Sequence, residues 1–177
     1  MTAVRRFRLW SARWAVGALL GSAYLVGTVF GRPRLRMLGL RQAAERQLRR
    51  RRPGTARRLA EELLRLADRL PPDWNHGNAL HHGHLLLGRV ALAEGDLRGA
   101  ADQLLAAART PGSPQLNSFG PNCQLALDLL KAGQPAPVMA YLEACGVFWK
   151  SDFGRRTEWM AAIRENRIPE FGGNLLY

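Results

Sequence analysis

The sequence predicts an all-α protein in which an N-terminal transmembrane helix precedes a helical domain. Three observations predict this fold class. An uncharged run of seventeen residues lies near the N-terminus, apolar residues recur at helical spacing between loops rich in proline and glycine, and no segment alternates apolar and polar residues as a half-buried strand does. The 177 residues, 47% of them hydrophobic, are enough for one core of ordinary size.

The uncharged run, WAVGALLGSAYLVGTVF, starts at Trp14. As a helix it would be about 25 Å long, which is just enough to cross the hydrocarbon core of a bilayer. Trp10, Trp14 and the arginines on both flanks suit the interfaces of a membrane. The alternative is a signal peptide cleaved after Ala23, but cleavage there would leave an apolar new N-terminus. We therefore expect an uncleaved single-pass anchor over residues 14–31, preceded by a basic tail over residues 1–13.

The formal charge of +12 belongs to the N-terminal third of the chain. Residues 1–58 contain fifteen arginines and one acidic residue, for a net charge of +14, whereas residues 59–177 contain eleven basic and thirteen acidic residues, for a net charge of −2. Four arginines precede the apolar run and nine follow it up to Arg52, so the positive-inside rule places the C-terminal domain in the cytoplasm. No aromatic residue is interleaved with the nine arginines, and we expect no nucleic-acid partner.

Residues 32–54 are predicted to form an arginine-rich stalk and first helix before the helical domain at residues 55–177. The run of helix formers ends at Pro53. Two interpretations of the arginines remain open: they lie against anionic lipid beside the membrane, or they are a topology signal and a solvated helix face. Two GxxxG spacings, Gly17 to Gly21 and Gly27 to Gly31, would let two anchors pack closely, so a homo-oligomer is possible.

The best-defined helical hairpin is predicted between Asn78 and Pro111. Its first helix contains Leu87 followed by Gly88, and a tight turn at Gly95 leads into the second helix. Three residues of the second helix share one face at helical spacing, namely Ala100, Leu104 and Ala107. The small residues would let two antiparallel backbones approach closely, and the leucines would fill the gaps between them.

Weaker copies of this pattern cover residues 125–145 and, upstream, a segment with residues 41–52 as its first helix. The combination of a Leu-Gly pair, a small residue, a bulky residue four positions later and a closing proline resembles the tetratricopeptide repeat, in a divergent form of bacterial type. The resemblance implies a short α-α superhelix of about three helical hairpins between residues 41 and 149. A capping helix is expected to follow, with Trp159, Ile163 and Ile168 covering the last hairpin.

The resemblance also implies that a protein or peptide partner binds the concave face formed by the first helices of the pairs. Eight residues map onto that face: Gln42, Glu45, Arg49, His82, Leu85, Arg89, Cys123 and Leu127. We expect Arg89 to be the main charged contact. Leu86 stands where the family members that bind a terminal carboxylate have Asn, so that mode of recognition is not expected. The alternative is that these positions are ordinary solvated helix faces.

All four histidines lie in the segment WNHGNALHHGHLLLG, where His81 and His84 share a helix face. This pair is the one candidate for a metal site, but Asp73 is the only carboxylate nearby, and His84 stands at a packing position where the family usually has Trp. Structural roles for these histidines are therefore favoured over a metal site. The two cysteines, Cys123 and Cys145, have no metal-ligand spacing and predict no disulfide framework.

The sequence contains no phosphate loop, nucleophile elbow, HExxH motif or pair of catalytic carboxylates, so we expect neither catalysis nor a cofactor. We expect a membrane-anchored adaptor or scaffold that binds a protein or peptide partner. The alternatives are a structural subunit of a larger membrane complex and a histidine-dependent, metal-binding enzyme. The long loop TPGSPQLNSFGPN is expected to set the angle between hairpins, with ligand contact as the alternative.

Overall fold

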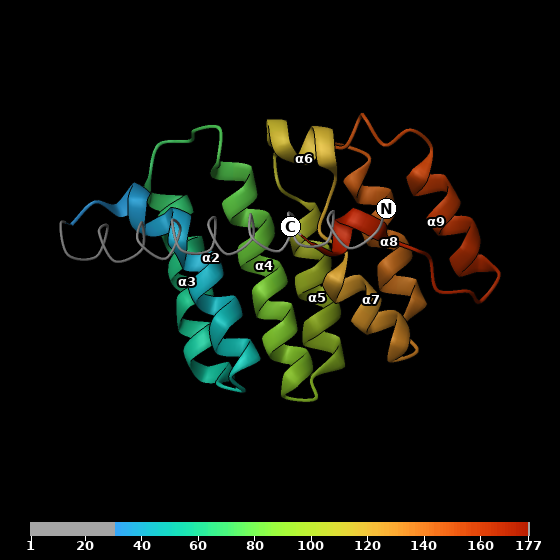
Figure 1. Ribbon diagram of the computed structural model, residues 1–177, viewed down its shortest axis with the longest axis horizontal. Helices are drawn as coiled ribbons and strands as arrows, with labels where there is room; N and C mark the ends of the chain where they lie inside the picture. The colour runs from blue at the N-terminus through green and yellow to red at the C-terminus, as the bar shows by residue number, and fades with distance from the viewer. Residues whose placement is uncertain (1–30, 177) are drawn as a thin grey trace, which may run out of the picture.

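The computed structural model describes residues 31–176, and every regular element within them is a helix (Figure 1). The elements are α2 (Pro33–Arg49), α3 (Pro53–Arg69), α4 (His76–Ala93), α5 (Leu97–Ala108), α6 (Pro114–Phe119), α7 (Gln124–Lys131), α8 (Pro135–Cys145), α9 (Arg155–Arg164) and the 3₁₀ helix η1 (Gly172–Leu175). The all-α class that the sequence predicts therefore holds for the described residues.

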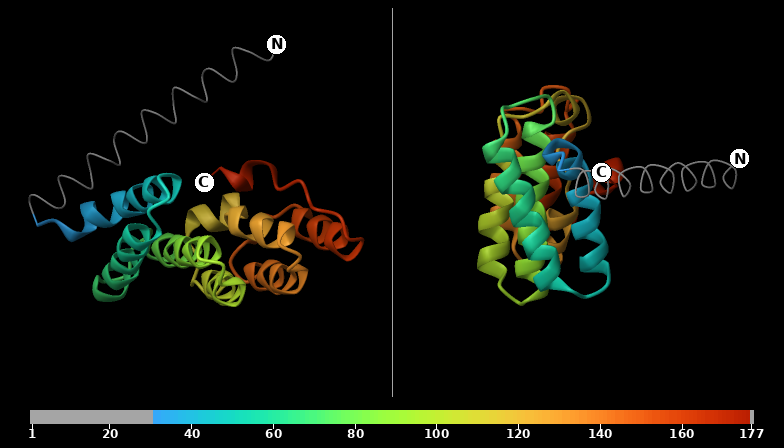
Figure 2. Two further views of the ribbon diagram at one scale, coloured as in Figure 1. Left: turned by 90° about the horizontal axis from the view of Figure 1, so that it is seen from below. Right: turned by 90° about the vertical axis from the view of Figure 1, so that its left-hand side faces the viewer.

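The helices are stacked in two layers (Figure 2). Helices α2, α4 and α7 lie on one side, and α3, α5 and α8 lie on the other. Consecutive helices from α2 to α5 contact one another along their lengths, and α5 packs against α8. The short α6 lies at one end of α4 (Figure 1). This arrangement leaves α4 between α2 on one side and α6 with α7 on the other.

Local sequence signals set most of the helix ends. Proline is the first residue of α2, α3, α6 and α8, where its missing N–H removes no helical hydrogen bond. The Asp96 carboxylate caps α5 by accepting the Gly99 N–H at 2.8 Å. Gly95, in the turn before it, has a φ of 84°, a conformation that glycine adopts at little cost.

Two hydrophobic clusters form the core. The first joins α2, α3 and α4 through buried residues that include Leu40, Ala60 and Leu63. The second joins α5 to the C-terminus through a larger set that includes Leu104, Leu125, Tyr141, Trp149 and Phe171. The second cluster contains most of the buried aromatic residues, so the C-terminal half is held by larger apolar contacts than the N-terminal half.

The hairpin predicted around Gly95 is formed by α4 and α5. The three residues predicted to share a face of α5, Ala100, Leu104 and Ala107, are fully buried. Gly88 lies against α5, where a Cβ would be 3.2 Å from the Ala100 carbonyl oxygen. Leu87 differs from expectation, because it is partly buried against the cluster of α2, α3 and α4 rather than between α4 and α5.

We expect Gly88→Ala to lower the free energy of unfolding by about 1–2 kcal/mol. The added methyl would lie 2.3 Å from a terminal carbon of Leu125, so that side chain must move. Gly54→Ala is the matched control, because Gly54 lies in the first turn of α3 with open space around it and alanine is the better helix former. Urea unfolding followed by circular dichroism measures both. Equal stability of the two variants would contradict the close packing of α4 on its neighbours.

The transmembrane prediction requires a correction. Among residues 31–176, no helix combines the length and the apolar composition that crossing a membrane requires. The longest, α4, has 18 residues but contains four histidines, an asparagine and an arginine. The predicted span, residues 14–31, and the glycine spacings that predict a homo-oligomer lie outside the described residues, except for Gly31. The anchor and the single-pass membrane localisation are not supported and are not part of the function that we propose.

The arginine-rich segment contributes to the folded core through α2. Met37, Leu40 and Ala44 are buried against α3 and α4. Arginines on the outer faces of α2 and α3 form ion pairs with acidic residues of other elements: Arg34 with Asp73, Arg36 with Glu62, and Arg57 with Glu94. Each such surface pair contributes only about 0–1 kcal/mol. These arginines of the described chain are therefore engaged within the fold.

The C-terminal residues pack back onto the second cluster. Helix α9 buries Trp159 and Ile163, as the predicted capping helix requires. Ile168 was expected to share this face, but it lies beyond the end of α9 and is 52% exposed. Phe171 and Asn174, in the segment that returns toward α6, are both buried. The end of the described chain is thus tied to the middle of the protein.

Candidate binding site

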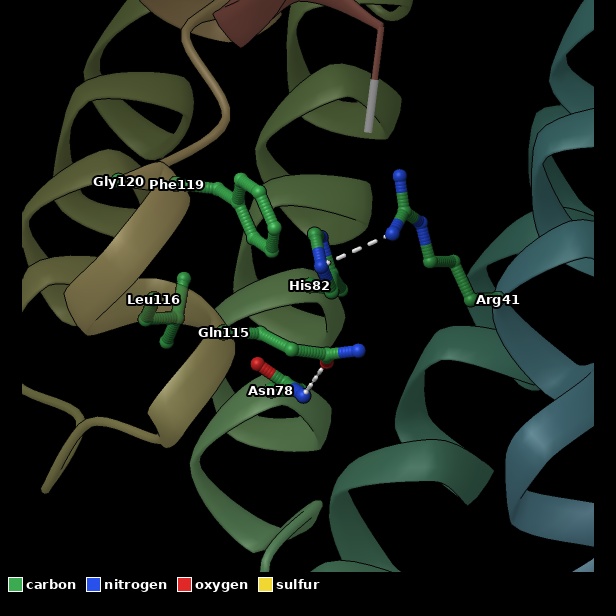
Figure 3. Close-up of a pocket in the computed structure, with 7 residues that line it drawn as sticks. All are labelled: Arg41, Asn78, His82, Gln115, Leu116, Phe119 and Gly120. Carbon is green, nitrogen blue, oxygen red and sulfur yellow. Dashed lines mark hydrogen bonds between the residues drawn. The ribbon is translucent and has the colours of Figure 1, made fainter.

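An open cavity of about 350 Å³ lies between α2, α4 and α6 (Figure 3). It is lined by Arg41 of α2, by two residues of α4 and by the α6 segment, namely Asn78, His82, Gln115, Leu116, Phe119 and Gly120. No carboxylate is among these lining residues. The volume falls within the range of about 300–1,000 Å³ that is typical of ligand sites. Because α2 and α4 belong to one core cluster and α6 packs at the other side, the cavity lies where the two clusters meet.

Helix α6 is held against α4 by a network of short polar side chains. The Ser113 hydroxyl accepts the Leu116 N–H at 3.0 Å, which caps α6, and donates to the Asn78 side-chain oxygen at 2.6 Å. The Asn78 amide group donates in turn to Asn75 and to Gln115. The Thr110 hydroxyl donates to the Gly77 carbonyl at 2.8 Å. This network fixes the position of α6, which forms one wall of the cavity, relative to α4.

The segment that follows α6 is held by side chains from three distant parts of the chain. The buried Asn174 amide donates to the carbonyls of Phe119 and Pro121, at 3.0 and 2.8 Å. The Tyr141 hydroxyl donates to the Asn122 carbonyl at 2.8 Å. Gly120 has a φ of 85° and lies so close to the Trp149 indole that a Cβ would be 2.5 Å from it. Only glycine fits this position, which lets the chain turn at the edge of the cavity.

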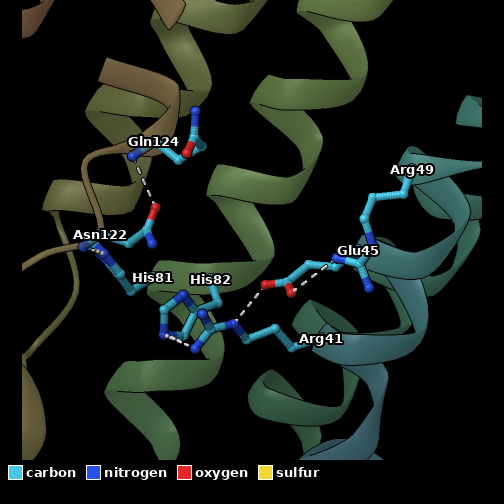
Figure 4. Close-up of polar contacts among 7 residues, drawn as sticks. All are labelled: Arg41, Glu45, Arg49, His81, His82, Asn122 and Gln124. Carbon is cyan, nitrogen blue, oxygen red and sulfur yellow. Dashed lines mark hydrogen bonds and ion pairs between the residues drawn. The ribbon is translucent and has the colours of Figure 1, made fainter. Parts of the chain in front are cut away.

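His81 connects this segment to α4 and α5 (Figure 4). Its side chain is fully buried, its Nδ1 is 3.0 Å from the Ala107 carbonyl oxygen, and its Nε2 accepts the Asn122 N–H at 3.1 Å. These partners require the neutral tautomer with the proton on Nδ1. Burial lowers the pKa of His81 from 6.5 to about 4, although the hydrogen bond to Ala107 opposes the shift. His81 is therefore a neutral structural residue at pH 7.

Arg41 is the charged residue of the cavity. Its Nε donates to Glu45 Oε1 at 2.9 Å, and its Nη1 lies 2.9 Å from His82 Nε2 (Figures 3 and 4). Glu45 also faces Arg49 at 3.9 Å. No residue of the described chain accepts a hydrogen bond from Arg41 Nη2, and Figure 3 shows the second terminal nitrogen directed away from His82. The guanidinium thus keeps unused N–H groups at the open side of the cavity.

His82 is partly buried in the cavity wall and serves as the acceptor for Arg41. Burial lowers its pKa well below 6.5, and the charge of Arg41 and the nearby His81 shift it in the same direction. Its Nε2 therefore has a lone pair for the guanidinium at neutral pH, which places the ring proton on Nδ1. Glu45 and His82 together fix the orientation of the Arg41 side chain.

The paired histidines do not form a metal site. His84 faces α5, as His81 does, but its Nδ1 lies 2.9 Å from the Gln103 side-chain oxygen, while both ring nitrogens of His81 are bound to backbone groups. Across residues 31–176, no three His, Cys, Asp or Glu side chains are grouped so that they could hold a metal ion. Burial raises the pKa of both Cys123 and Cys145, which makes them poor nucleophiles.

The residues predicted to form the binding face are only partly brought together. His82 lines the cavity, Glu45 pairs with Arg41, and Arg49 pairs with Glu45 one helical turn further along α2. Leu85 and Cys123 are buried in the core and do not line the cavity. Three residues, Gln42, Arg89 and Leu127, are partly buried but do not line the cavity. Arg89 lies two helical turns along α4 from His82, so the charged contact of this cavity is Arg41 instead.

A second surface feature lies along one edge of the protein. Four large apolar side chains in the segments between α3 and α4, in α6, and between α8 and α9 are 58–83% exposed, namely Trp74, Phe119, Val147 and Phe153. These segments lie along the same edge, at the top of Figure 1. The turns at the opposite edge, by contrast, carry mainly charged residues, glycine and alanine.

The cavity and the apolar edge are the two surfaces of the described chain that suit a ligand or partner. What they bind has to be inferred from their own chemistry. No protein family, curated protein or solved structure matches the chain.

Proposed function

We propose that the protein is a non-enzymatic adaptor that binds a protein or peptide partner in the cavity between α2, α4 and α6. The observation that carries this proposal is the combination, in one open cavity, of an arginine with unused donors and the apolar walls formed by Leu116 and Phe119. A peptide offers both chemical features that such a cavity needs, a charged or polar group and an apolar side chain, on one flexible chain.

The environment of the titratable groups supports binding rather than catalysis. His81 has both ring nitrogens occupied, and His82 Nε2 is engaged by Arg41. The cavity wall holds no nucleophile, and the carboxylate nearest to it, Glu45, already pairs with Arg41 and Arg49. The groups that general acid or base catalysis requires are therefore committed to structural contacts. The resemblance of the helix pairs to tetratricopeptide repeats remains a prediction that agrees with a peptide-binding role.

Binding to an array of random 12-residue peptides, acetylated at one end and amidated at the other, tests this function. Gln115→Trp places a large side chain over the cavity, and Ser118→Trp, on the same short helix but outside the lining, is the matched control. We expect the wild type and Ser118→Trp to bind the same peptides, and Gln115→Trp to bind them at least tenfold more weakly. Equal binding by the two tryptophan variants would contradict the proposal.

A structural subunit of a larger assembly is the second candidate, and the exposed apolar edge favours it. Its four large apolar side chains lie in separate segments along one edge, and exposed apolar side chains gathered on one side of a protein can mark contact with another protein. Phe153→Ser, which changes the most exposed of these side chains, separates the candidates within the same experiment. Peptide binding that survives Gln115→Trp but is lost in Phe153→Ser would place the partner at the edge instead of the cavity.

A further inference from the structure

We propose that the cavity selects peptides in which an aspartate or glutamate side chain lies next to an apolar side chain. The carboxylate binds the Arg41 guanidinium, and the apolar side chain packs against Leu116 and Phe119. This inference rests on the proposed function, because it names the ligand chemistry of the same cavity.

The charge of the cavity favours a carboxylate. Among residues 31–176, Arg41 is the one charged side chain that lines the cavity, and the row of Arg41, Glu45 and Arg49 along α2 has a net charge of +1. The remaining polar lining residues are neutral, since the pKa of His82 is held well below 6.5 by burial and by Arg41. An acidic side chain in the cavity thus meets a row of side chains whose net charge is positive, and none of the described lining residues is a carboxylate.

Arg41 is already oriented for this contact. Its Nε and Nη1 are held by Glu45 and His82 at 2.9 Å each, so little conformational freedom remains to be lost when a ligand binds. The donors without a partner among the described residues are on Nη2 and on the second N–H of Nη1, and a carboxylate can accept from them. The contacts that restrain the arginine therefore leave donors for the ligand.

The rest of the cavity offers no second cation and few spare donors. The Asn78 amide group already donates to Asn75 and to Gln115, and its oxygen already accepts from Ser113. On the α6 side the exposed ring of Phe119 supplies apolar surface and faces Arg41 across the cavity (Figure 3), and Leu116, the other apolar side chain of the lining, is almost fully buried. A ligand with one carboxylate beside one apolar side chain matches a cavity that is cationic on the α2 side and apolar on the α6 side. Because the ligand carboxylate in our proposal belongs to a side chain, blocking both ends of the peptide should leave binding intact.

The test has two parts. The first identifies which peptides of the array the protein binds, and the second is a double-mutant cycle between Arg41 and the acidic residue of the peptide. Among the doubly blocked 12-residue peptides that the wild type binds, we expect Asp or Glu at one position and an apolar residue beside it. For the best such peptide, Arg41→Gln should weaken binding at least tenfold, and replacing the peptide acid by its amide should weaken binding to the wild type by a similar factor. The two changes together should cost little more than either alone, because they remove the same contact.

Arg49→Gln is the matched control. It makes the same charge change on the same helix and removes a contact to the same Glu45, but Arg49 does not line the cavity and its side chain is 65% exposed. Its effect should stay within threefold. The role of His82 as a positioning residue is tested with His82→Gln, which keeps an acceptor for Arg41, and His82→Leu, which does not. Only His82→Leu should reduce the preference of the protein for acidic peptides over the corresponding amide peptides.

The possible failures are distinguishable. If no peptide binds, whether its C-terminus is amidated or free, or if Gln115→Trp leaves binding unchanged, the proposed function itself is wrong. Two results would leave the adaptor function standing and overturn the carboxylate inference. Peptides could bind in the cavity without a preference for acids, or the losses of binding caused by Arg41→Gln and by the amide peptide could be additive. Binding that requires a free C-terminus would overturn the side-chain source. Circular dichroism shows whether each variant is folded. Replacing the acidic residue of the peptide by its amide is measured with the wild-type protein, so this result does not depend on the folding of a variant.

Discussion

Replacing His81 by leucine is expected to lower the free energy of unfolding at pH 7.5 by about 3 kcal/mol, since two backbone groups would lose their partners in the interior. The first is the Ala107 carbonyl in the last turn of α5. In a helix this carbonyl would accept a hydrogen bond from the N–H of the residue four positions later. That residue is Pro111, which has no N–H. The imidazole supplies the missing donor at 3.0 Å.

The second group is the Asn122 N–H, just before α7, which His81 Nε2 accepts at 3.1 Å. Leucine fills a similar space but offers neither a donor nor an acceptor, so both groups would lose the hydrogen bond that His81 provides. Because Asn122 follows Gly120 at the edge of the cavity, the same substitution should also loosen the wall of the binding site. We therefore expect weaker peptide binding by His81→Leu in addition to lower stability.

Urea unfolding at pH 7.5 measures this effect, with His84→Leu as the control. His84 lies on the same face of α4 but bonds only to the Gln103 side chain, which is partly exposed and can turn to water instead. The control should lose no more than about 1 kcal/mol. Equal losses in the two leucine variants would show that the contacts of His81 with the backbone add nothing beyond those of an ordinary helix-face histidine.

The α4-α5 hairpin could be predicted from the sequence because its signals are local. The turn at Gly95, the cap at Asp96 and the spacing of the buried alanines and leucine on α5 all act within a few residues of where they occur. The roles of Leu87 and Ile168 were predicted less well. Each is apolar at a plausible spacing, but the cluster it joins, or its exposure, depends on helices that are distant in the sequence.

The binding site was harder to predict, for two physical reasons. The cavity uses Arg41, whereas the predicted face used its neighbour Gln42, and one residue turns a helix by about 100°. The other wall is α6, a helix of six residues inside a segment predicted as a loop, where Ser113 and Pro114 together were the available cap signal. Among the residues that line the cavity, His82 alone was placed on the predicted binding face, since its position follows from the phase of the long helix α4. The loop that contains α6 was predicted to contact a ligand only as an alternative.

The second large effect is a loss of stability in mild acid. Burial lowers the pKa of His81 to about 4 in the folded protein, whereas the unfolded chain has the usual value near 6.5. Above pH 6.5 the residue is neutral in both states and does not change the stability. As the pH falls from 6.5 to 4, the His81 ring is protonated in the unfolded state but stays neutral in the folded state. The free energy of unfolding therefore falls by about 3 kcal/mol from this residue alone.

Comparing wild type with His81→Gln at pH 7 and pH 5 isolates this contribution, because every other ionisable group is present in both proteins. Between these two pH values we expect the wild type to lose about 2 kcal/mol more than the variant. Proton NMR of the His81 ring gives an independent measure, with the neutral form expected down to a pH near 4. If the ring instead gained its proton near pH 6.5 in the folded protein, it could not accept the Asn122 N–H, and the fixed tautomer that joins α4, α5 and the segment before α7 would be disproved together with the pH effect.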